Sequence, residues 1–371
     1  MTAPLARPPA FPTRRASGRR SRRRRTALSF AAALVGGLLA AGTPASADGP
    51  PRPDGADEPR RPPNFLFVLV DDQGWTGTSV PMDGADPRSK SDYYLTPNLE
   101  RLAREGTRFS RGYSPAPNCS PSRMAILTGK TPARLQFTDI VGRGHRTDLG
   151  GRQRLRPGGK GVRAIQPEEI TLPELLKSLP DAGYRTAHFG KWHLGKQQPP
   201  GRHGFDVSDG PTGNREGSLG PRVGDDPKRA FSVTERANAF MTDAVESGRP
   251  FYCQVSHYAV HQAIQHRAAS LAQAEARESG AVHDDPAYAA MTADLDDALG
   301  RLLTRLDELG VAENTYVVYQ ADNGSPHHLS VSPPLRRFKP EIWEGGVRVP
   351  TLVRGPGVPA GAQCDLPTSG A

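Results

Sequence analysis

Short apolar runs alternate with helical segments along most of this chain, and this alternation constrains its fold more than any other feature. The run 65–70 is short, continuous and apolar, as in a buried parallel strand; three further short runs are strand-like, and five segments have helical patterns. The strand-like runs are 65–70, 184–189, 251–255 and 315–320, and the helical segments are 97–105, 120–128, 172–179, 228–247 and 287–309. Such an order predicts an α/β fold, with a mostly parallel sheet flanked by helices on both faces.

Polar residues follow all four strand-like runs. They are Asp71 and Asp72, then Lys191 and His193, then His261, and finally Asp322 and Asn323. In open α/β sheets, ligands bind at the carboxyl ends of the strands. We therefore expect these groups, which are distant in the sequence, to converge on one edge of the sheet.

The acidic members of this set predict a divalent metal site. Three carboxylates and one amide oxygen are hard ligands, which suit Ca²⁺ or Mg²⁺ and offer no soft donor for zinc or copper. Three acids in one cleft also need a cation, because uncompensated carboxylates are costly to bury. The alternative is that the two pairs belong to ordinary turns after strands.

Cys119 begins the segment Cys119-Ser120-Pro121-Ser122-Arg123, and Leu127-Thr128-Gly129-Lys130 follows soon after it. By its chemistry alone, this cysteine is a buried thiol or a thiolate nucleophile. The segment resembles the signature of type I sulfatases, the arylsulfatase-like enzymes of the alkaline phosphatase superfamily. Four further segments match this family in its order, between about residues 63 and 350. The resemblance implies an alkaline-phosphatase-like fold and a sulfuric ester hydrolase.

The family resemblance implies a modified nucleophile at Cys119. A formylglycine-generating enzyme, which reads Pro121 and Arg123, would convert Cys119 to formylglycine. One hydroxyl of the aldehyde hydrate attacks sulfur, and the other drives release of sulfate. The resemblance also implies that a cation, usually Ca²⁺, is bound by the modified Cys119 together with Asp71, Asp72, Asp322 and Asn323.

Five cationic or titratable residues receive roles from the same resemblance. Arg123 holds the hydrate and the carboxylates. Lys191, in Gly190-Lys191-Trp192-His193-Leu194-Gly195, binds sulfate oxygens, and His193 accepts a proton during hemiacetal breakdown. An extended segment here would place both side chains on one face. The alternative for His193 is a structural histidine.

His261 and Lys339 complete the set. His261 matches the family's proton donor to the leaving oxygen, although Ala263 replaces the usual proline, and His257 is its competitor. Lys339 precedes Trp343-Glu344-Gly345-Gly346 at the family's spacing and is expected to contact sulfate. A lysine in a basic loop is otherwise usually solvated.

The first 47 residues have the layout of a secretory signal. A basic run at 14–25 and an apolar run at 27–41 precede the small residues Ala45-Ser46-Ala47. We expect residues 48–62 to be a flexible leader and residues 63–371 the catalytic domain. The predicted location is secreted or in the cell envelope or periplasm, by Sec or twin-arginine export, without stable membrane association. The alternative is a membrane anchor or a basic arm that binds nucleic acid.

Charge gives no support for nucleic-acid binding, and the cysteine content excludes a disulfide scaffold. The chain has 48 Lys and Arg residues against 39 Asp and Glu residues, but nine arginines and no acid lie in residues 1–47, so the remainder has 39 of each sign. The high pI therefore gives no reason to expect nucleic-acid binding. The other two cysteines, Cys253 and Cys364, are too few for a disulfide scaffold, and the sequence leaves open whether they pair.

The substrate expected from the resemblance is a sulfated carbohydrate or an aryl sulfate. The Gly- and Arg-rich loop 138–167, with Thr131 to Arg134 before it, favours a sugar. Two rivals remain: a phosphodiester or phosphonate monoester hydrolase of the same superfamily, and a catalytically dead protein that binds sulfated glycans. Because sulfatases ordinarily continue into a smaller C-terminal subdomain, we also expect this chain to be truncated and poorly soluble.

Overall fold

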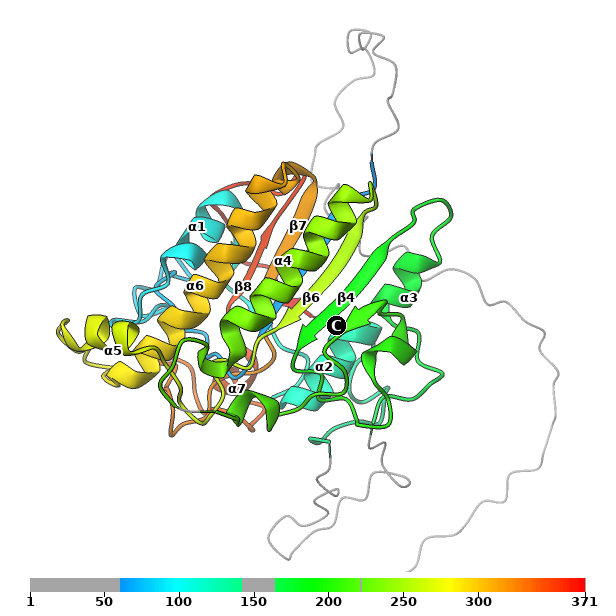
Figure 1. Cartoon of the computed structure of the whole chain (residues 1–371). Coiled ribbons are helices and arrows are strands. Elements are labelled where there is room, and N and C mark those ends of the chain that lie inside the picture. Colours follow the sequence, from blue (N-terminus) through cyan, green and yellow to red (C-terminus); the bar gives the residue numbers. More distant parts are fainter. Residues whose placement is uncertain (1–60, 142–163, 221, 371) are drawn as a thin grey trace, which may run out of the picture. The chain divides into compact units, whose positions relative to one another are not determined.

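An eight-stranded sheet forms the centre of the computed structural model, which describes residues 61–141, 164–220 and 222–370 (Figure 1). Its strand order is β5-β4-β6-β1-β7-β8-β2-β9, and β3 and β10 form a separate two-stranded sheet. The strands are β1 (Asn64–Val70), β2 (Thr107–Phe109), β3 (Gly112–Tyr113), β4 (Arg185–Gly190), β5 (Val207–Ser208), β6 (Phe251–Ser256), β7 (Thr315–Ala321), β8 (Thr351–Arg354), β9 (Ala362–Cys364) and β10 (Thr368–Ser369).

The four predicted strands are β1, β4, β6 and β7, and they lie side by side. β1 pairs in parallel with β6 and with β7, and β4 pairs in parallel with β6. β8 is antiparallel to both β7 and β2. The mostly parallel sheet predicted from the sequence is therefore confirmed, and the carboxyl ends of its four central strands share one edge.

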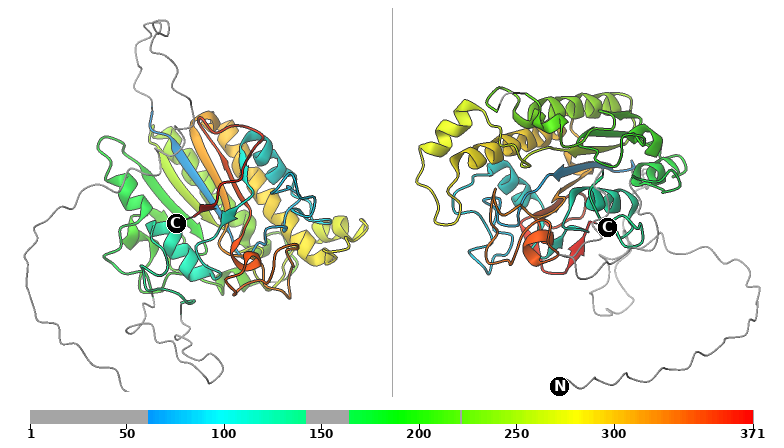
Figure 2. Two further views of the ribbon diagram at one scale, coloured as in Figure 1. Left: turned by 180° about the vertical axis from the view of Figure 1, so that it is seen from behind. Right: turned by 90° about the horizontal axis from the view of Figure 1, so that it is seen from below.

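Helices cover both faces of this sheet (Figure 2). α1, α4 and α6 contribute to the hydrophobic cluster on one face, and α2 and α3 contribute to a second cluster on the other. The helices are α1 (Pro97–Glu105), α2 (Cys119–Thr128), α3 (Leu172–Lys177), α4 (Ala230–Glu246), α5 (Ala268–Glu275), α6 (Pro286–Glu308) and α7 (Glu344–Val347). Short 3-10 turns lie at Pro200–His203, Glu216–Ser218, Pro227–Arg229 and Ala312–Asn314.

Strand β1 shows how the two clusters are separated. Leu66, Val68 and Val70 are buried in the cluster with α4 and α6, whereas Phe65 and Phe67 pack against the cluster with α2. Successive side chains of a strand point to opposite faces, so one apolar run serves both layers. Each fully buried aliphatic side chain contributes about 1.5–3 kcal/mol, which makes this central strand a rigid support for the residues that follow it.

The amino end of α1 is capped by a residue that lies far away in the sequence. Thr96 is the N-cap residue, but its side chain makes no capping bond. Instead Asp296 of α6 accepts hydrogen bonds from the backbone N–H groups of Asn98 and Leu99, each at 2.9 Å. Thr96 Oγ1 accepts from the backbone N–H of Ser79 at 2.9 Å. The cap therefore also fixes α1 against α6.

Two predicted helices differ from the structure. α3 ends at Lys177 rather than at residue 179, and Leu175 and Leu179, which have helical spacing with Leu172, are 46% and 45% exposed. α4 begins at Ala230 rather than at residue 228. Lys228 and Arg229 both have a φ of 53°, in the left-handed region, which cannot continue a right-handed helix. The centre of the predicted loop 138–167, residues 142–163, lies outside the described residues.

Cys253 and Cys364 lie too far apart to form a disulfide. Cys253 is in β6 and Cys364 is in β9, with β1, β7, β8 and β2 between them. Neighbouring strands are about 4.8 Å apart, whereas bridged cysteines have Cα atoms within about 7 Å. All three cysteines are free. Within the described residues, no helix is both long and apolar enough to cross a membrane; the proposed signal segment is not among them.

Candidate active site

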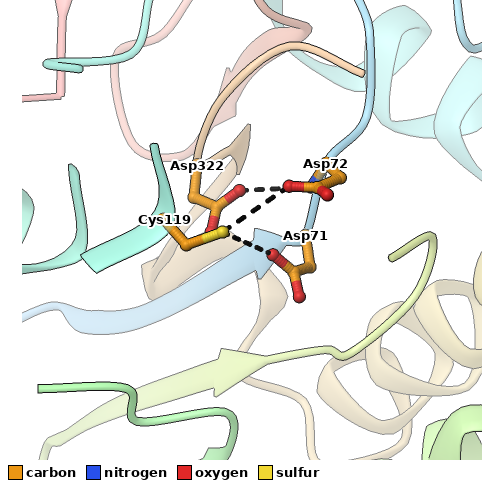
Figure 3. Close-up of side chains that lie close together, drawn as sticks. All are labelled: Asp71, Asp72, Cys119 and Asp322. Atoms are coloured by element: carbon orange, nitrogen blue, oxygen red, sulfur yellow. Dashed lines mark hydrogen bonds between the residues drawn. The ribbon is translucent and has the colours of Figure 1, made fainter. Parts of the chain in front are cut away.

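Four side chains from three elements meet at the carboxyl edge of the sheet (Figure 3). Asp71 and Asp72 follow β1, Asp322 follows the neighbouring strand β7, and Cys119 begins α2. One potential ligand atom from each of the four lies within 4.8 Å of the others. All four side chains are buried, with at most 2% exposure. We call these four residues the site floor.

The backbone of the strand ends holds the floor together. The N–H of Asp322 donates to the carbonyl of Val70 at 3.0 Å, and the N–H of Asp72 donates to Asp322 Oδ1 at 3.1 Å. Asp72 has a φ of 63°, a left-handed conformation that aspartate tolerates better than most residues. This turn ends β1 and directs two consecutive carboxylates into the same small space.

Cys119 lies at the first position of α2. Its Sγ is 3.5 Å from Asp71 Oδ1 and 3.6 Å from Asp72 Oδ1, and Lys339 Nζ is 2.9 Å from it. Burial, with the nearby charge of Asp322, raises the pKa of the Cys119 thiol far above its ordinary value. An unmodified Cys119 is therefore a neutral thiol and a weak nucleophile.

Three cations pair with the carboxylates of the floor. Arg123 lies one turn after Cys119 on α2, and its Nε donates to Asp322 Oδ2 at 2.8 Å. Lys191 Nζ lies 2.5 Å from Asp71 Oδ2, and Lys339 Nζ contacts Asp72 Oδ1. Arg123 Nη1 also donates to the carbonyl of Lys191 at 2.7 Å, which links α2 to the end of β4.

The charges of the floor are unevenly compensated. Burial alone would raise the pKa of Asp71, but Lys191, His261 and Arg123 outweigh it and hold that pKa well below its usual range. For Asp322, burial prevails over the attraction of Arg123 and raises the pKa to about 6. Additional positive charge beside Asp322 would therefore favour its ionised form.

The donor atoms fit a hard divalent cation. Asn323 Nδ2 donates to Asp72 Oδ1 at 2.7 Å and to the carbonyl of Gly324 at 2.9 Å. Within the described part of the chain, the buried Oδ1 of Asn323 has no hydrogen-bond partner. An unsatisfied amide oxygen beside three carboxylates is a set of ligands that Ca²⁺ or Mg²⁺ would complete.

Comparison with known proteins agrees with this arrangement. A family model described as Sulfatase matches residues 63–369. The chain belongs to the sulfatase family. It is 31% identical to the N-acetylgalactosamine-6-sulfatase of Canis lupus familiaris over 83% of its length, and 32% identical to the same enzyme of Homo sapiens over 82%. The matches span only 60% and 59% of those two relatives.

A solved structure supports the fold. The crystal structure of Ps i-CgsB in complex with k-i-k-neocarrahexaose superimposes with a TM-score of 0.67 and 24% identity, over 83% of this chain and 69% of that one. The predicted membership in the sulfatase family and the mostly parallel sheet are thus confirmed.

Of the two candidate histidines after β6, His261 faces the site floor. Its Nε2 is 3.8 Å from Asp72 Oδ2, and its Nδ1 is 2.6 Å from the carbonyl of Gln262. His257 is fully buried, and neither of its ring nitrogens has a hydrogen-bond partner among the described residues. Burial lowers the pKa of His257 to about 4, so this ring is neutral.

His193 does not follow the extended geometry expected for it. Its φ is 56°, because the chain turns directly after β4 and the His193 N–H donates to the carbonyl of Thr212 at 2.9 Å. The simple alternation that would place Lys191 and His193 on one face is therefore absent. Burial, with the charge of Lys191, lowers the pKa of His193 well below its ordinary value.

His261 and Lys339 are the more exposed of the described side chains that contact the floor carboxylates. The side chains of His261 and Lys339 are 13% and 11% exposed, whereas Arg123 and Lys191 are as buried as the floor. Beside these two residues, His328 Nε2 lies 3.0 Å from Gln262 Oε1, and the ring of His327 packs on Phe338. We call His261, Lys339 and these neighbours the site mouth.

One buried residue near the mouth was not predicted. Lys228, in the turn before α4, is 2% exposed, and its Nζ lies 3.4 Å from the carbonyl oxygen of Gln262 and 3.2 Å from that of Ala263. Its sequence context, Asp-Asp-Pro-Lys-Arg ahead of a helix, is typical of a solvated turn. No local signal distinguishes this lysine from a surface one.

Proposed function

We propose that this chain hydrolyses sulfate esters, using a formylglycine made from Cys119 and one bound divalent cation. The observation that carries the proposal is the position of Cys119 Sγ, 3.5 Å from Asp71 and 3.6 Å from Asp72, among oxygen donors suited to Ca²⁺ or Mg²⁺. When both groups are present, they supply an aldehyde-hydrate nucleophile and a Lewis acid that lowers its pKa. Asp71, Asp72, Asp322 and Asn323 would hold the cation.

The charge of the site suits an anionic substrate. Three carboxylates are balanced by three cations, Arg123, Lys191 and Lys339. A divalent cation on the carboxylates would leave a surplus of two positive charges in a buried site. Lys191 and Lys339, which contact Asp71 and Asp72, would then be free to bind sulfate oxygens. Fixed positive charge in a desolvated site stabilises charge that develops in the transition state.

The histidines would handle the protons. His261 Nδ1 lies against the Gln262 carbonyl, so its Nε2 is the nitrogen that faces the site and would protonate the leaving oxygen. Burial lowers the pKa of His261, which makes its protonated form a stronger acid. His193 is neutral and its buried Nδ1 is unpartnered among the described residues, so it is available to accept a proton.

A sulfated saccharide is the proposed substrate, and an aryl sulfate is the alternative. The two relatives are named for action on a 6-sulfated amino sugar, and the mouth carries hydrogen-bonding groups such as His328 and Gln262. We also propose that a formylglycine-generating enzyme modifies Cys119 and that residues 1–47 direct export. Residues 48–62 would then be a flexible leader, and the catalytic domain would begin at residue 63.

Co-expression with a formylglycine-generating enzyme tests the function. We expect 4-nitrophenyl sulfate to be hydrolysed in a Ca²⁺- or Mg²⁺-dependent way, and peptide mass spectrometry to find the aldehyde at position 119. Turnover in the Cys119→Ala variant should fall by about 10⁴-fold or more, because the nucleophile is absent. Faster turnover of bis-nitrophenyl phosphate or of a phosphonate monoester would favour a phosphodiester or phosphonate monoester hydrolase. Formation of the aldehyde without turnover, together with glycan binding, would favour a catalytically dead protein that binds sulfated glycans.

A further inference from the structure

Lys228 is a buried ammonium group without a carboxylate partner among the described residues. Its only hydrogen-bond acceptors there are the carbonyl oxygens of Gln262 and Ala263, at 3.4 and 3.2 Å. Placing a lysine at 2% exposure is costly unless a specific contact compensates. Burial lowers the pKa of Lys228 to about 8, although Asp71 and Asp72 act in the opposite direction. The contact between the Lys228 ammonium and the two carbonyl oxygens is therefore the interaction that compensates the cost of burial.

The backbone at Lys228 is also held in an unusual conformation. Lys228 and Arg229 are consecutive non-glycine residues with φ of 53°, which is strained for each. Asp226 Oδ1 holds the start of α4 by accepting from Phe231 N–H at 2.9 Å, and Gln265 Oε1 accepts from Lys228 N–H at 2.8 Å. These contacts turn the Lys228 side chain towards residues 262–263.

The Gln262 carbonyl links Lys228 to His261. This one oxygen lies 2.6 Å from His261 Nδ1 and 3.4 Å from Lys228 Nζ. A carbonyl oxygen can only accept, so His261 Nδ1 must carry the hydrogen, and Nε2 is the nitrogen directed to Asp72. The other side of this loop is tied to the residue that follows β1: Asp71 N–H donates to the backbone carbonyl of Ala259 at 3.0 Å, and Val260 N–H donates to the backbone carbonyl of Asp71 at 2.7 Å. Lys228 anchors the side that those bonds do not reach.

We propose that Lys228 is a positioning residue for His261: it fixes the Gln262 and Ala263 carbonyls, and the Gln262 carbonyl fixes the tautomer and direction of the imidazole. This inference rests on the proposed function only for the role of His261 as proton donor. The link from Lys228 Nζ through the Gln262 carbonyl to His261 Nδ1 can be tested without measuring turnover. Lys228 touches neither the floor nor the substrate in this account.

Two substrates of different leaving-group basicity test the catalytic consequence. In Lys228→Met, kcat for an alkyl or sugar sulfate should fall about 10- to 100-fold, because its leaving oxygen needs a proton, whereas kcat for 4-nitrophenyl sulfate should change by less than about threefold. KM should change little for both. Arg229→Met is the matched control, since Arg229 has the same φ but is exposed. An equal fall for both substrates in Lys228→Met, or the same pattern in Arg229→Met, would overturn the proposal.

Nitrogen-15 NMR of the histidine rings tests the geometry without turnover. In the unmodified full chain, with His261 assigned from the spectrum of His261→Ala, we expect the neutral ring to carry its proton on Nδ1. Lys228→Met should shift this ring towards a mixture of tautomers, and Arg229→Met should not. A wild-type ring protonated on Nε2 would overturn the inference even if Lys228→Met fails to fold. Absence of all sulfate ester turnover in the wild type would instead contradict the proposed function and leave this measurement valid.

Discussion

The floor and the mouth of the site differ in how their side chains are held. The floor residues follow two central parallel strands or begin a buried helix, and none is more than 2% exposed. His261 and Lys339 of the mouth belong to loops, and their side chains are 13% and 11% exposed. The comparison teaches that the rigid strand ends hold the groups that must not move. Residues that would meet the substrate are carried by loops positioned on that scaffold.

Lys339 and Lys228, two lysines beside the site, allow a second comparison in electrostatic terms. Burial opposes the charge of both, but Asp72 and the other acids raise the pKa of Lys339 well above its ordinary value. Among the described residues, the Lys228 ammonium hydrogen-bonds to carbonyl oxygens alone, and burial lowers its pKa to about 8. The charged partner, rather than burial, decides how firmly a buried lysine keeps its proton. The following predictions test this contrast between floor and mouth.

Arg123→Met removes a cation that pairs with the floor carboxylates and should have the largest effect on stability. Asp322 and Asp71 would lose a buried partner, and breaking such a pair costs about 3–5 kcal/mol. We expect a correspondingly lower midpoint in urea unfolding followed by circular dichroism without added metal. A midpoint within experimental error of the wild type would show that the floor is not the rigid region described here.

Lys339→Met removes a cation from the mouth and should act mainly on turnover. Loss of one preorganised positive group typically costs about 10²–10³ in kcat, or about 2.7–4 kcal/mol of transition-state stabilisation. Without added metal, as for Arg123→Met, we expect its urea midpoint to fall less than that of Arg123→Met, because Lys339 lies partly in solvent. Steady-state kinetics with 4-nitrophenyl sulfate would measure the loss of kcat, and the same urea series would measure the loss of stability. A loss of stability in Lys339→Met that exceeds its loss of transition-state stabilisation would contradict this prediction.

Metal binding should stabilise the floor. Calcium at about 100 times its Kd should add about 2.7 kcal/mol to the free energy of unfolding, and a chelator should remove this gain. Asp72→Asn should greatly reduce the effect, whereas Asp92→Asn, which alters a carboxylate away from the floor that contacts His283, should preserve it. Differential scanning calorimetry with calcium, magnesium and chelator would measure the shifts. Equal stabilisation of both variants would place the cation elsewhere.

His257 should make the protein sensitive to mild acid. Its folded pKa of about 4 lies below its ordinary value of 6.5, so the unfolded chain binds more protons between these values. Stability must then decrease as pH falls through that window, by about 2 kcal/mol between pH 7.5 and pH 5 for this group. His257→Phe should remove that part of the loss, while the exposed His328→Phe should not. Urea midpoints at the two pH values would test it; parallel losses in wild type and His257→Phe would exclude this explanation.

Much of the fold was predictable because its signals are local. β1 was visible as a continuous apolar run, since a strand buried on both faces needs no polar alternation, and β4, β6 and β7 were visible as short strand-like runs. α3 was less predictable: Leu175 and Leu179 have helical spacing with Leu172, yet both are exposed. A periodic pattern shows which residues could share a face, but it does not show whether another element covers that face.

The sequence by itself determined the order of strands and helices, the polar residues at the strand ends and the segment around Cys119, because backbone periodicity and short motifs depend on neighbours along the chain. Only the tertiary structure decided that Asp296 caps α1, that His261 rather than His257 faces Asp72, and that Lys228 is buried beside Gln262. Each of these outcomes depends on contacts between segments that are distant along the chain. Burial and partner atoms, which fix the charge and direction of a polar side chain, exist only once those segments have packed.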